Sequence, residues 1–143
     1  MKRKAAGRIA RAEVIACIAH AGQTDKAGMP YVEHCSRVAG KLSDPRAKTV
    51  AWLHDVIEDG SIDETCLRGA FGARIVDAVV AITQREGEKR SPYYARVRAN
   101  RLARQVKLAD IHDNLEPARL ALLKRREAAR LVVKYGKALK AIA

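Results

Sequence analysis

Apolar residues recur three or four positions apart along almost the whole chain, which is the period of an α-helix that buries one face. Ile9, Val14, Ile15 and Ile18 follow this spacing near the amino terminus. The gaps between such segments hold glycine, proline or residues that cap helices. Because no segment alternates in the manner of a strand, we predict an all-α fold of six to eight helices in a single domain, residues 1–143.

The expected helices are placed by these breaks. Asp44 followed by Pro45 is typical of a helix start, as is Asp63, and Ser91-Pro92 suggests a further one. Gly60-Ser61 should end the apolar segment that begins at Pro45. The predicted helices cover about residues 8–21, 30–42, 45–59, 63–71, 73–83, 92–99, 101–114 and 118–140.

Composition excludes several classes of protein. A chain of 143 residues with 48% hydrophobic residues is long and apolar enough to bury a core, which excludes disorder as its main state. The three cysteines have no CxxC spacing, which argues against a disulfide framework or a thiolate zinc site. No apolar run is long enough for a membrane span, and no signal peptide is recognisable. We therefore expect a cytoplasmic protein with reduced thiols.

The net charge of +12 is unevenly distributed along the sequence. Residues 1–11 carry +5, residues 12–84 carry −3 and residues 85–143 carry +10. A basic balance of this size indicates a polyanionic partner or substrate. The mildly acidic middle segment contains most of the histidines, so the charge pattern also suggests a cation site flanked by basic segments.

Polar residues able to bind a metal interrupt three of the expected apolar helices. They are His34, the pair His54-Asp55 and Asp110, with Glu58-Asp59 and Asn114 close by in the sequence. A single histidine on an apolar helix face is more often a hydrogen-bonded core residue. The ordered combination of all four is harder to obtain from core packing, because buried charges without compensation cost several kcal/mol each.

A divalent cation would supply that compensation. Two imidazoles and two carboxylates form a mixed nitrogen and oxygen set, which suits Mn²⁺ or Fe²⁺ and can also bind Zn²⁺. Such an ion polarises a phosphoryl oxygen and acidifies a bound water. If the helix continues past Asp55, Glu58 lies one turn further on, where it could orient or deprotonate that water.

Five segments resemble the HD-domain metal-dependent phosphohydrolases. They are residues 19–24 (AHAGQT), 28–34 (GMPYVEH), 50–59 (VAWLHDVIED), 71–72 (FG) and 106–110 (VKLAD) followed by Asn114. The resemblance covers about residues 8–120 and is greatest to the (p)ppGpp hydrolase domain of RelA/SpoT enzymes and to the stand-alone small alarmone hydrolases. A basic helix over about residues 118–140 follows this motif-bearing core.

The resemblance implies a helical HD domain that holds Mn²⁺. It implies metal ligands at His34, His54, Asp55 and Asp110, and an acidic pair, Glu58 and Asp59, that handles the attacking water. The implied substrate is guanosine tetra- or pentaphosphate, from which the 3′-pyrophosphate is removed. In a chain of this length, the resemblance implies hydrolysis without a synthetase domain.

The resemblance also places three residues at the substrate. Asn114 matches a residue that lines the nucleotide pocket, Thr83 matches a threonine near a phosphate, and Lys26 lies in the loop after the first motif. For Thr83, a hydrogen bond back to its own helix is an equal alternative.

Two positions depart from the alarmone hydrolase pattern. Asp25 stands where those enzymes usually have an arginine that packs on guanine, and Ile111 stands where they usually have a basic residue. A different phosphorylated nucleotide is therefore an alternative substrate. A second alternative is a nucleic-acid-associated protein, although aromatic residues for stacking are few and there is no recognisable reader motif. The sequence does not indicate an oligomeric state.

Overall fold

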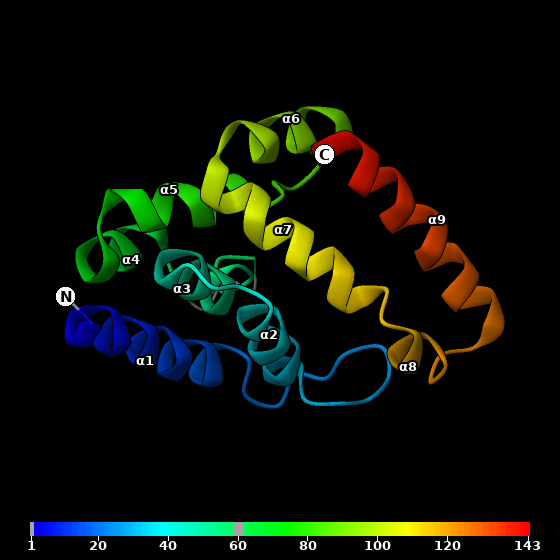
Figure 1. Ribbon diagram of the computed structural model, residues 1–143, viewed down its shortest axis with the longest axis horizontal. Helices are drawn as coiled ribbons and strands as arrows, with labels where there is room; N and C mark the ends of the chain where they lie inside the picture. The colour runs from blue at the N-terminus through cyan, green and yellow to red at the C-terminus, as the bar shows by residue number, and fades with distance from the viewer. Residues whose placement is uncertain (1, 59–61) are drawn as a thin grey trace.

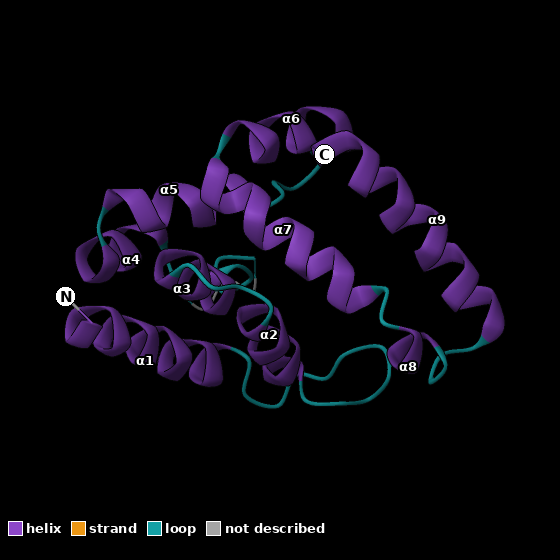
Figure 2. Cartoon of the chain, in the orientation of Figure 1, coloured by secondary structure: helices purple, strands orange, loops and turns teal. Residues whose placement is uncertain are grey.

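The computed structural model describes residues 2–58 and 62–143. The prediction of an all-α fold is confirmed, because the described residues form helices with no named strand (Figure 2). Thr24 and Pro30 form an isolated antiparallel bridge in the loop after the first helix. In chain order, the helices of the described residues are α1 (Lys2–Ala19), α2 (Tyr31–Gly40), α3 (Pro45–Leu53), α4 (Glu64–Phe71), α5 (Ala73–Ile82), α6 (Arg90–Ala99), α7 (Arg101–Asn114), α8 (Pro117–Leu120) and α9 (Arg125–Ile142).

Helix α7 runs through the middle of the molecule (Figure 1). Helices α2, α3 and α5 pack against it, while α6 and α9 pack against it and against each other. Helix α1 contacts α3 from the outside. The largest fully buried side chains include Leu53 of α3, Val76 of α5 and Val106 of α7, so the core lies where these three helices meet.

Two predicted helix starts are confirmed by their caps. The carboxylate of Asp44 accepts a hydrogen bond from the Arg46 amide at 2.9 Å, and that of Asp63 accepts one from the Cys66 amide at 2.8 Å. Such bonds satisfy amides that have no partner within the helix. The prediction that Ser91 is a cap is wrong, because α6 already begins at Arg90. Pro92 is tolerated there, since amides in the first turn need no helical partner.

Helix α3 is shorter than predicted and ends at Leu53. The carbonyl of Ala51 accepts a hydrogen bond from Nδ1 of His54 at 2.6 Å. In a continuing helix this carbonyl would instead accept from the amide of Asp55. Residues 54–58 therefore form turns, and the stacking of Glu58 one helical turn above Asp55 does not occur.

The last predicted helix, 118–140, is divided into α8 and α9, which raises the number of helices in the described part of the chain to nine. Lys124 has an extended backbone (φ −60°, ψ 141°) and separates the two. Neither glycine nor proline marks this break in the sequence, so periodicity alone missed it. Among the described residues, no helix is long and apolar enough to cross a bilayer.

Candidate active site

Two buried imidazoles and a buried carboxylate meet at the centre of the molecule. His34 comes from α2, His54 directly follows α3 and Asp110 lies on α7. Each offers one nitrogen or oxygen atom, and these three atoms all lie within 4.8 Å of one another. Nε2 of His34 is 2.9 Å from Oδ1 of Asp110, and Nε2 of His54 is 3.8 Å from the same oxygen. The structure thus brings together three of the four predicted metal ligands.

Hydrogen bonds orient both imidazoles. Nδ1 of His34 lies 2.7 Å from Oδ2 of Asp113, and Nδ1 of His54 lies 2.6 Å from the carbonyl oxygen of Ala51. These contacts at Nδ1 fix each ring so that its Nε2 faces Asp110. Metal-binding histidines are commonly held in this way by a carboxylate or a carbonyl.

Asp55, the fourth predicted ligand, lies beside His54 but outside the group of three. Its Oδ2 is 3.0 Å from Nε2 of His54 and accepts a hydrogen bond from the hydroxyl of Tyr31. Burial favours the protonated acid, but the charge of His54 and hydrogen bonds from His54 and Tyr31 outweigh it and lower the pKa of Asp55 to about 2. The carboxylate is therefore ionised at neutral pH and directed at the imidazole.

The charge of Asp110 is balanced from a second side. Nζ of Lys107 is 3.0 Å from its Oδ2, and Nδ2 of Asn114 is 3.1 Å from its Oδ1. Burial opposes ionisation of Asp110, yet Lys107 and the two imidazoles hold its pKa well below the usual value. Lys107 is itself largely enclosed, and the charge of Asp110 raises its pKa against the effect of burial. The site therefore carries a cation and carboxylates in close contact.

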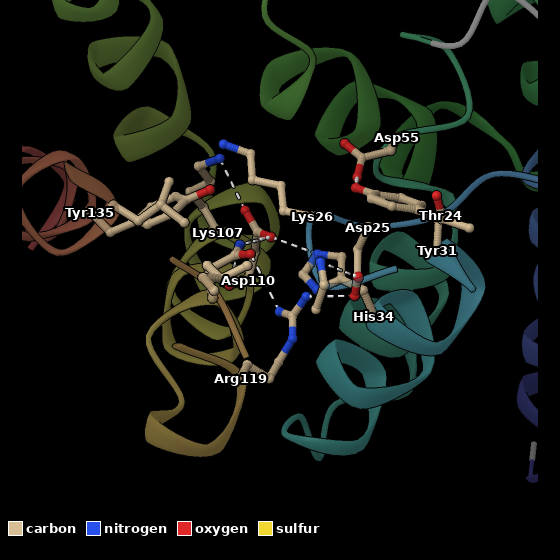
Figure 3. A pocket seen from close by; sticks show the side chains of 14 residues that line it. Thr24, Asp25, Lys26, Tyr31, His34, Asp55, Lys107, Asp110, Arg119 and Tyr135 are labelled. Carbon is tan, nitrogen blue, oxygen red and sulfur yellow. Dashed lines mark hydrogen bonds and ion pairs between the residues drawn. The ribbon is translucent and has the colours of Figure 1, made fainter. Parts of the chain in front are cut away.

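A cavity of about 310 Å³ opens onto this group. Figure 3 shows Lys107, Asp110 and Tyr135 on one side, and Tyr31 and Asp55 on the other. A cavity that combines cationic and aromatic side chains with a few fixed polar groups suits a small anionic ligand. It is lined by Thr24, Asp25, Lys26, Ala27, Tyr31, His34, Asp55, Lys107, Asp110, Asn114, Arg119, Leu123, Leu131 and Tyr135.

The departure from the family pattern at Asp25 has a structural role. One carboxylate oxygen accepts hydrogen bonds from the amides of Ala27 at 2.9 Å and Met29 at 3.0 Å, and the other is 2.9 Å from Nη2 of Arg119. Burial favours the neutral acid, but these partners lower the pKa of Asp25. Both oxygens are therefore engaged in holding the loop.

The other predicted site residues are placed differently. Lys26 and Asn114 line the cavity. Glu58 and Thr83 are not among its lining residues: Glu58 accepts a hydrogen bond from the amide of Gln84 at 3.1 Å, and Thr83 donates to the carbonyl of Val79 at 2.7 Å. Thr83 therefore makes the hydrogen bond back to its own helix that was the alternative to a phosphate contact. Asp59 lies outside the described residues.

Several site residues were not predicted from the sequence. Asp113 is fully buried and lies 2.7 Å from His34, and Arg119 contacts Asp113 at 2.8 Å. The position of Asp113, three residues after Asp110, was a usable signal, because residues three apart share a helix face. Nothing in the sequence pointed to Arg119 or Tyr135, whose positions follow from the break before α9.

Comparison with known proteins points to the same group of hydrolases. No protein-family model matches the chain. The guanosine-3′,5′-bis(diphosphate) 3′-pyrophosphohydrolase of Haemophilus influenzae is 37% identical over 75 residues, which are 50% of this chain and 11% of that protein. The bifunctional (p)ppGpp synthase/hydrolase SpoT of Escherichia coli is 33% identical over 81 residues, or 54% of this chain and 12% of that protein. The chain thus spans about a tenth of the length of these curated relatives.

A solved structure matches over nearly the whole chain. It is that of a metazoan ortholog of SpoT described as hydrolysing ppGpp, and it superposes with a TM-score of 0.79 at 21% identity, covering 94% of this chain and 85% of that one. The chain has the fold of that protein. The predicted similarity to RelA/SpoT-type hydrolase domains is therefore confirmed in sequence and in fold.

Proposed function

We propose that this chain is a metal-dependent phosphohydrolase that removes the 3′-pyrophosphate from guanosine 3′,5′-bis(diphosphate). The observation that carries the proposal is the group of His34, His54 and Asp110 beside a cavity lined by three basic residues, Lys26, Lys107 and Arg119. The similarity to curated 3′-pyrophosphohydrolases supports the choice of substrate.

The residues present fit a divalent ion. Nε2 of His54 is buried and faces Oδ2 of Asp55 at 3.0 Å, and a metal would bind this nitrogen in place of its proton. We propose His34, His54, Asp55 and Asp110 as the ligands, and Mn²⁺ as the ion, since mixed imidazole and carboxylate sets suit it. When bound, such an ion supplies a Lewis acid for a phosphoryl oxygen and an acidified water.

The acidic pair after Asp55 is proposed to handle the attacking water. Burial and the nearby charge of Asp55 raise the pKa of Glu58, which makes its carboxylate a better proton acceptor near neutral pH. We assign proton removal to Glu58 and orientation of the water to Asp59. The water oxygen bonds to the phosphorus next to the ribose, the bond from that phosphorus to the 3′-oxygen breaks, and the 3′-oxygen leaves as a hydroxyl after taking a proton from solvent.

The remaining cavity residues hold the nucleotide. Lys26, Lys107 and Arg119 line the cavity, where their positive charge attracts phosphate oxygens. Asn114 is fixed by its bonds to Asp110, so it presents its amide in one orientation. Thr83 is proposed to approach a phosphate only if its hydroxyl leaves the carbonyl of Val79.

The experiment is a nucleotide panel that includes ppGpp, assayed with Mn²⁺ and with a chelator. We expect release of pyrophosphate from ppGpp with Mn²⁺ and none with the chelator. Asp55→Ala should lose bound metal and activity together. Glu58→Gln should retain the metal and slow turnover by about 10²–10⁴-fold, the usual contribution of a general base. Full activity in Asp55→Ala would contradict the ligand assignment.

A different phosphorylated nucleotide is the second candidate substrate. The observation that favours it is Asp25. Its carboxylate is held by Ala27, Met29 and Arg119, so this position supplies no positive charge to pack on a guanine base. Turnover in the panel of another nucleotide, with ppGpp left intact, would select this candidate and retain the metal site.

A further inference from the structure

A basic groove lies between α6 and α9 and shares Lys26 with the residues assigned above to the nucleotide. Figure 1 shows these two helices side by side near the carboxyl terminus, and they are in contact. The groove consists of two adjoining hollows of about 280 and 370 Å³ that share Arg90, Lys134 and Lys137. We call this the α6–α9 groove. Its basic lining residues are Lys26, Arg90, Arg98, Arg130, Lys134 and Lys137.

The positive charge of the groove is poorly neutralised. Glu127 is the nearby carboxylate, at 3.7 Å from Lys26 and 3.9 Å from Arg130. Within the described part of the chain, no ion pair joins a carboxylate to Arg90, Lys134 or Lys137. Partial burial and the neighbouring cations lower the pKa of Lys134. These cations lie close together although they repel one another. Such an arrangement indicates a site for an anion with several charges.

The groove continues into the catalytic cavity. Lys26 and Leu131 line both. An anionic chain that leaves the cavity past Lys26 therefore meets Arg90, Lys134 and Lys137 next. A nucleotide bound with one phosphate group at the metal has its other phosphates to place, and this continuity favours such a ligand over a nucleic acid, which would need no link to the cavity.

We propose that the α6–α9 groove binds the phosphate groups of the substrate that are not cleaved, with Lys26 shared between the groove and the catalytic cavity. The inference rests on the proposed function and deepens it: the enzyme recognises a nucleotide with phosphates at two positions. The lysines act as point charges and Arg90 as a fork for phosphate oxygens. The groove contributes to binding and takes no part in bond breaking.

The test removes the three groove cations that pair with no carboxylate of residues 2–58 and 62–143, in the variant Arg90→Gln/Lys134→Gln/Lys137→Gln. The control, Lys2→Gln/Arg3→Gln/Lys4→Gln, lowers the net charge equally at exposed positions on α1. Both are assayed with Mn²⁺ on guanosine 5′-diphosphate 3′-diphosphate and on guanosine 5′-monophosphate 3′-diphosphate, which differ only in the uncleaved phosphates. Binding of inorganic triphosphate to chelator-treated protein is measured by calorimetry.

For the groove variant, we expect KM for the 5′-diphosphate substrate to rise about tenfold, with kcat within about twofold, because exposed charge contacts are individually weak and contribute to binding alone. KM for the 5′-monophosphate substrate should rise less, and the control should match the wild type. Equal increases for both substrates, or no increase, would overturn the inference.

Failure of the proposed function is distinguishable from failure of the groove. If the wild type cleaves neither nucleotide, the proposed function fails, while the triphosphate measurement still tests the groove. Weaker triphosphate binding by the groove variant than by the control supports the inference that the groove binds phosphate groups. Equal triphosphate binding by the two variants overturns the inference. Duplex RNA binding is measured as well, and its loss in the groove variant with KM unchanged also overturns the inference.

Discussion

Replacement of Asp113 by asparagine tests whether a residue outside the proposed metal ligands sets the affinity of the site for metal. Asp113 is buried on α7, and its Oδ2 lies 2.7 Å from Nδ1 of His34. Asparagine keeps the shape of the side chain and removes its charge. The imidazole then becomes less basic, and an amide can turn its NH₂ group toward Nδ1, which would favour the wrong tautomer of His34.

The magnitude follows from the geometry. Loss of a carboxylate that orients a metal-binding histidine lowers metal affinity by about 10–100-fold, or about 1.4–2.7 kcal/mol. Asp113 also accepts hydrogen bonds from Arg37 at 2.9 Å and Arg119 at 2.8 Å, so the metal-free protein should lose a further ~1–3 kcal/mol of stability. The two effects are separated by comparing each protein with and without metal.

The assay is a titration of Mn²⁺ by calorimetry, together with melting curves in excess Mn²⁺ and in chelator. At saturating metal, the stabilisation by Mn²⁺ should fall by about 1.4–2.7 kcal/mol, which reduces the Mn²⁺-dependent rise in Tm by about 4–8 °C for a chain of this size. Asp77→Asn is the matched control, because that exposed carboxylate pairs, among the described residues, only with Arg68 at 2.9 Å. An unchanged dissociation constant for Mn²⁺ in Asp113→Asn would refute the orienting role.

Three further predictions concern the scaffold. Leu53→Ala removes a fully buried side chain and should cost about 2–5 kcal/mol in chemical denaturation; a loss below about 1 kcal/mol would contradict the packing. Asp44→Ala removes the cap bond to Arg46 and should cost about 1 kcal/mol, measured in the same way. Arg96 lowers the pKa of Glu88 to about 2 from 4.5, so this pair stabilises the fold above pH 4.5 and its contribution disappears as the pH falls toward 2. Melting curves of Glu88→Gln should show a smaller loss of stability over that pH range than the wild type, and parallel curves would exclude the linkage.

Local signals predicted most of the fold. The starts of α3 and α4 were visible because a capping carboxylate and a proline act within a few residues of the helix they start. The end of α3 was not visible, because it depends on the side chain of His54 bonding to Ala51, and helical periodicity carries no information about that bond. The break at Lys124 was missed for a similar reason, since an amphipathic pattern can continue across two helices.

More residues of the candidate metal site than of the cavity beside it could be predicted from the sequence. His34, His54 and Asp110 stand out in sequence because buried polar residues on apolar helices need compensation, and the structure brings them together. The partners that orient them are less visible. Asp113 is one more acidic residue on a helix until α2 and α7 pack together and bring it to His34. Arg119 is one of 28 basic residues, and only the tertiary fold distinguishes it.

Arg119 also explains how the departure at Asp25 is compatible with the candidate metal site. Its guanidinium contacts Oδ2 of Asp25 through Nη2 at 2.9 Å and Oδ2 of Asp113 through Nη1 at 2.8 Å. One side chain thus joins the loop over the cavity to the carboxylate that orients His34. An arginine at position 25 would place two like charges together and would also lose the bonds to the amides of Ala27 and Met29. Asp25 and Arg119 therefore form a unit, and an exchange of either one alone should disturb the loop and the orientation of His34 together.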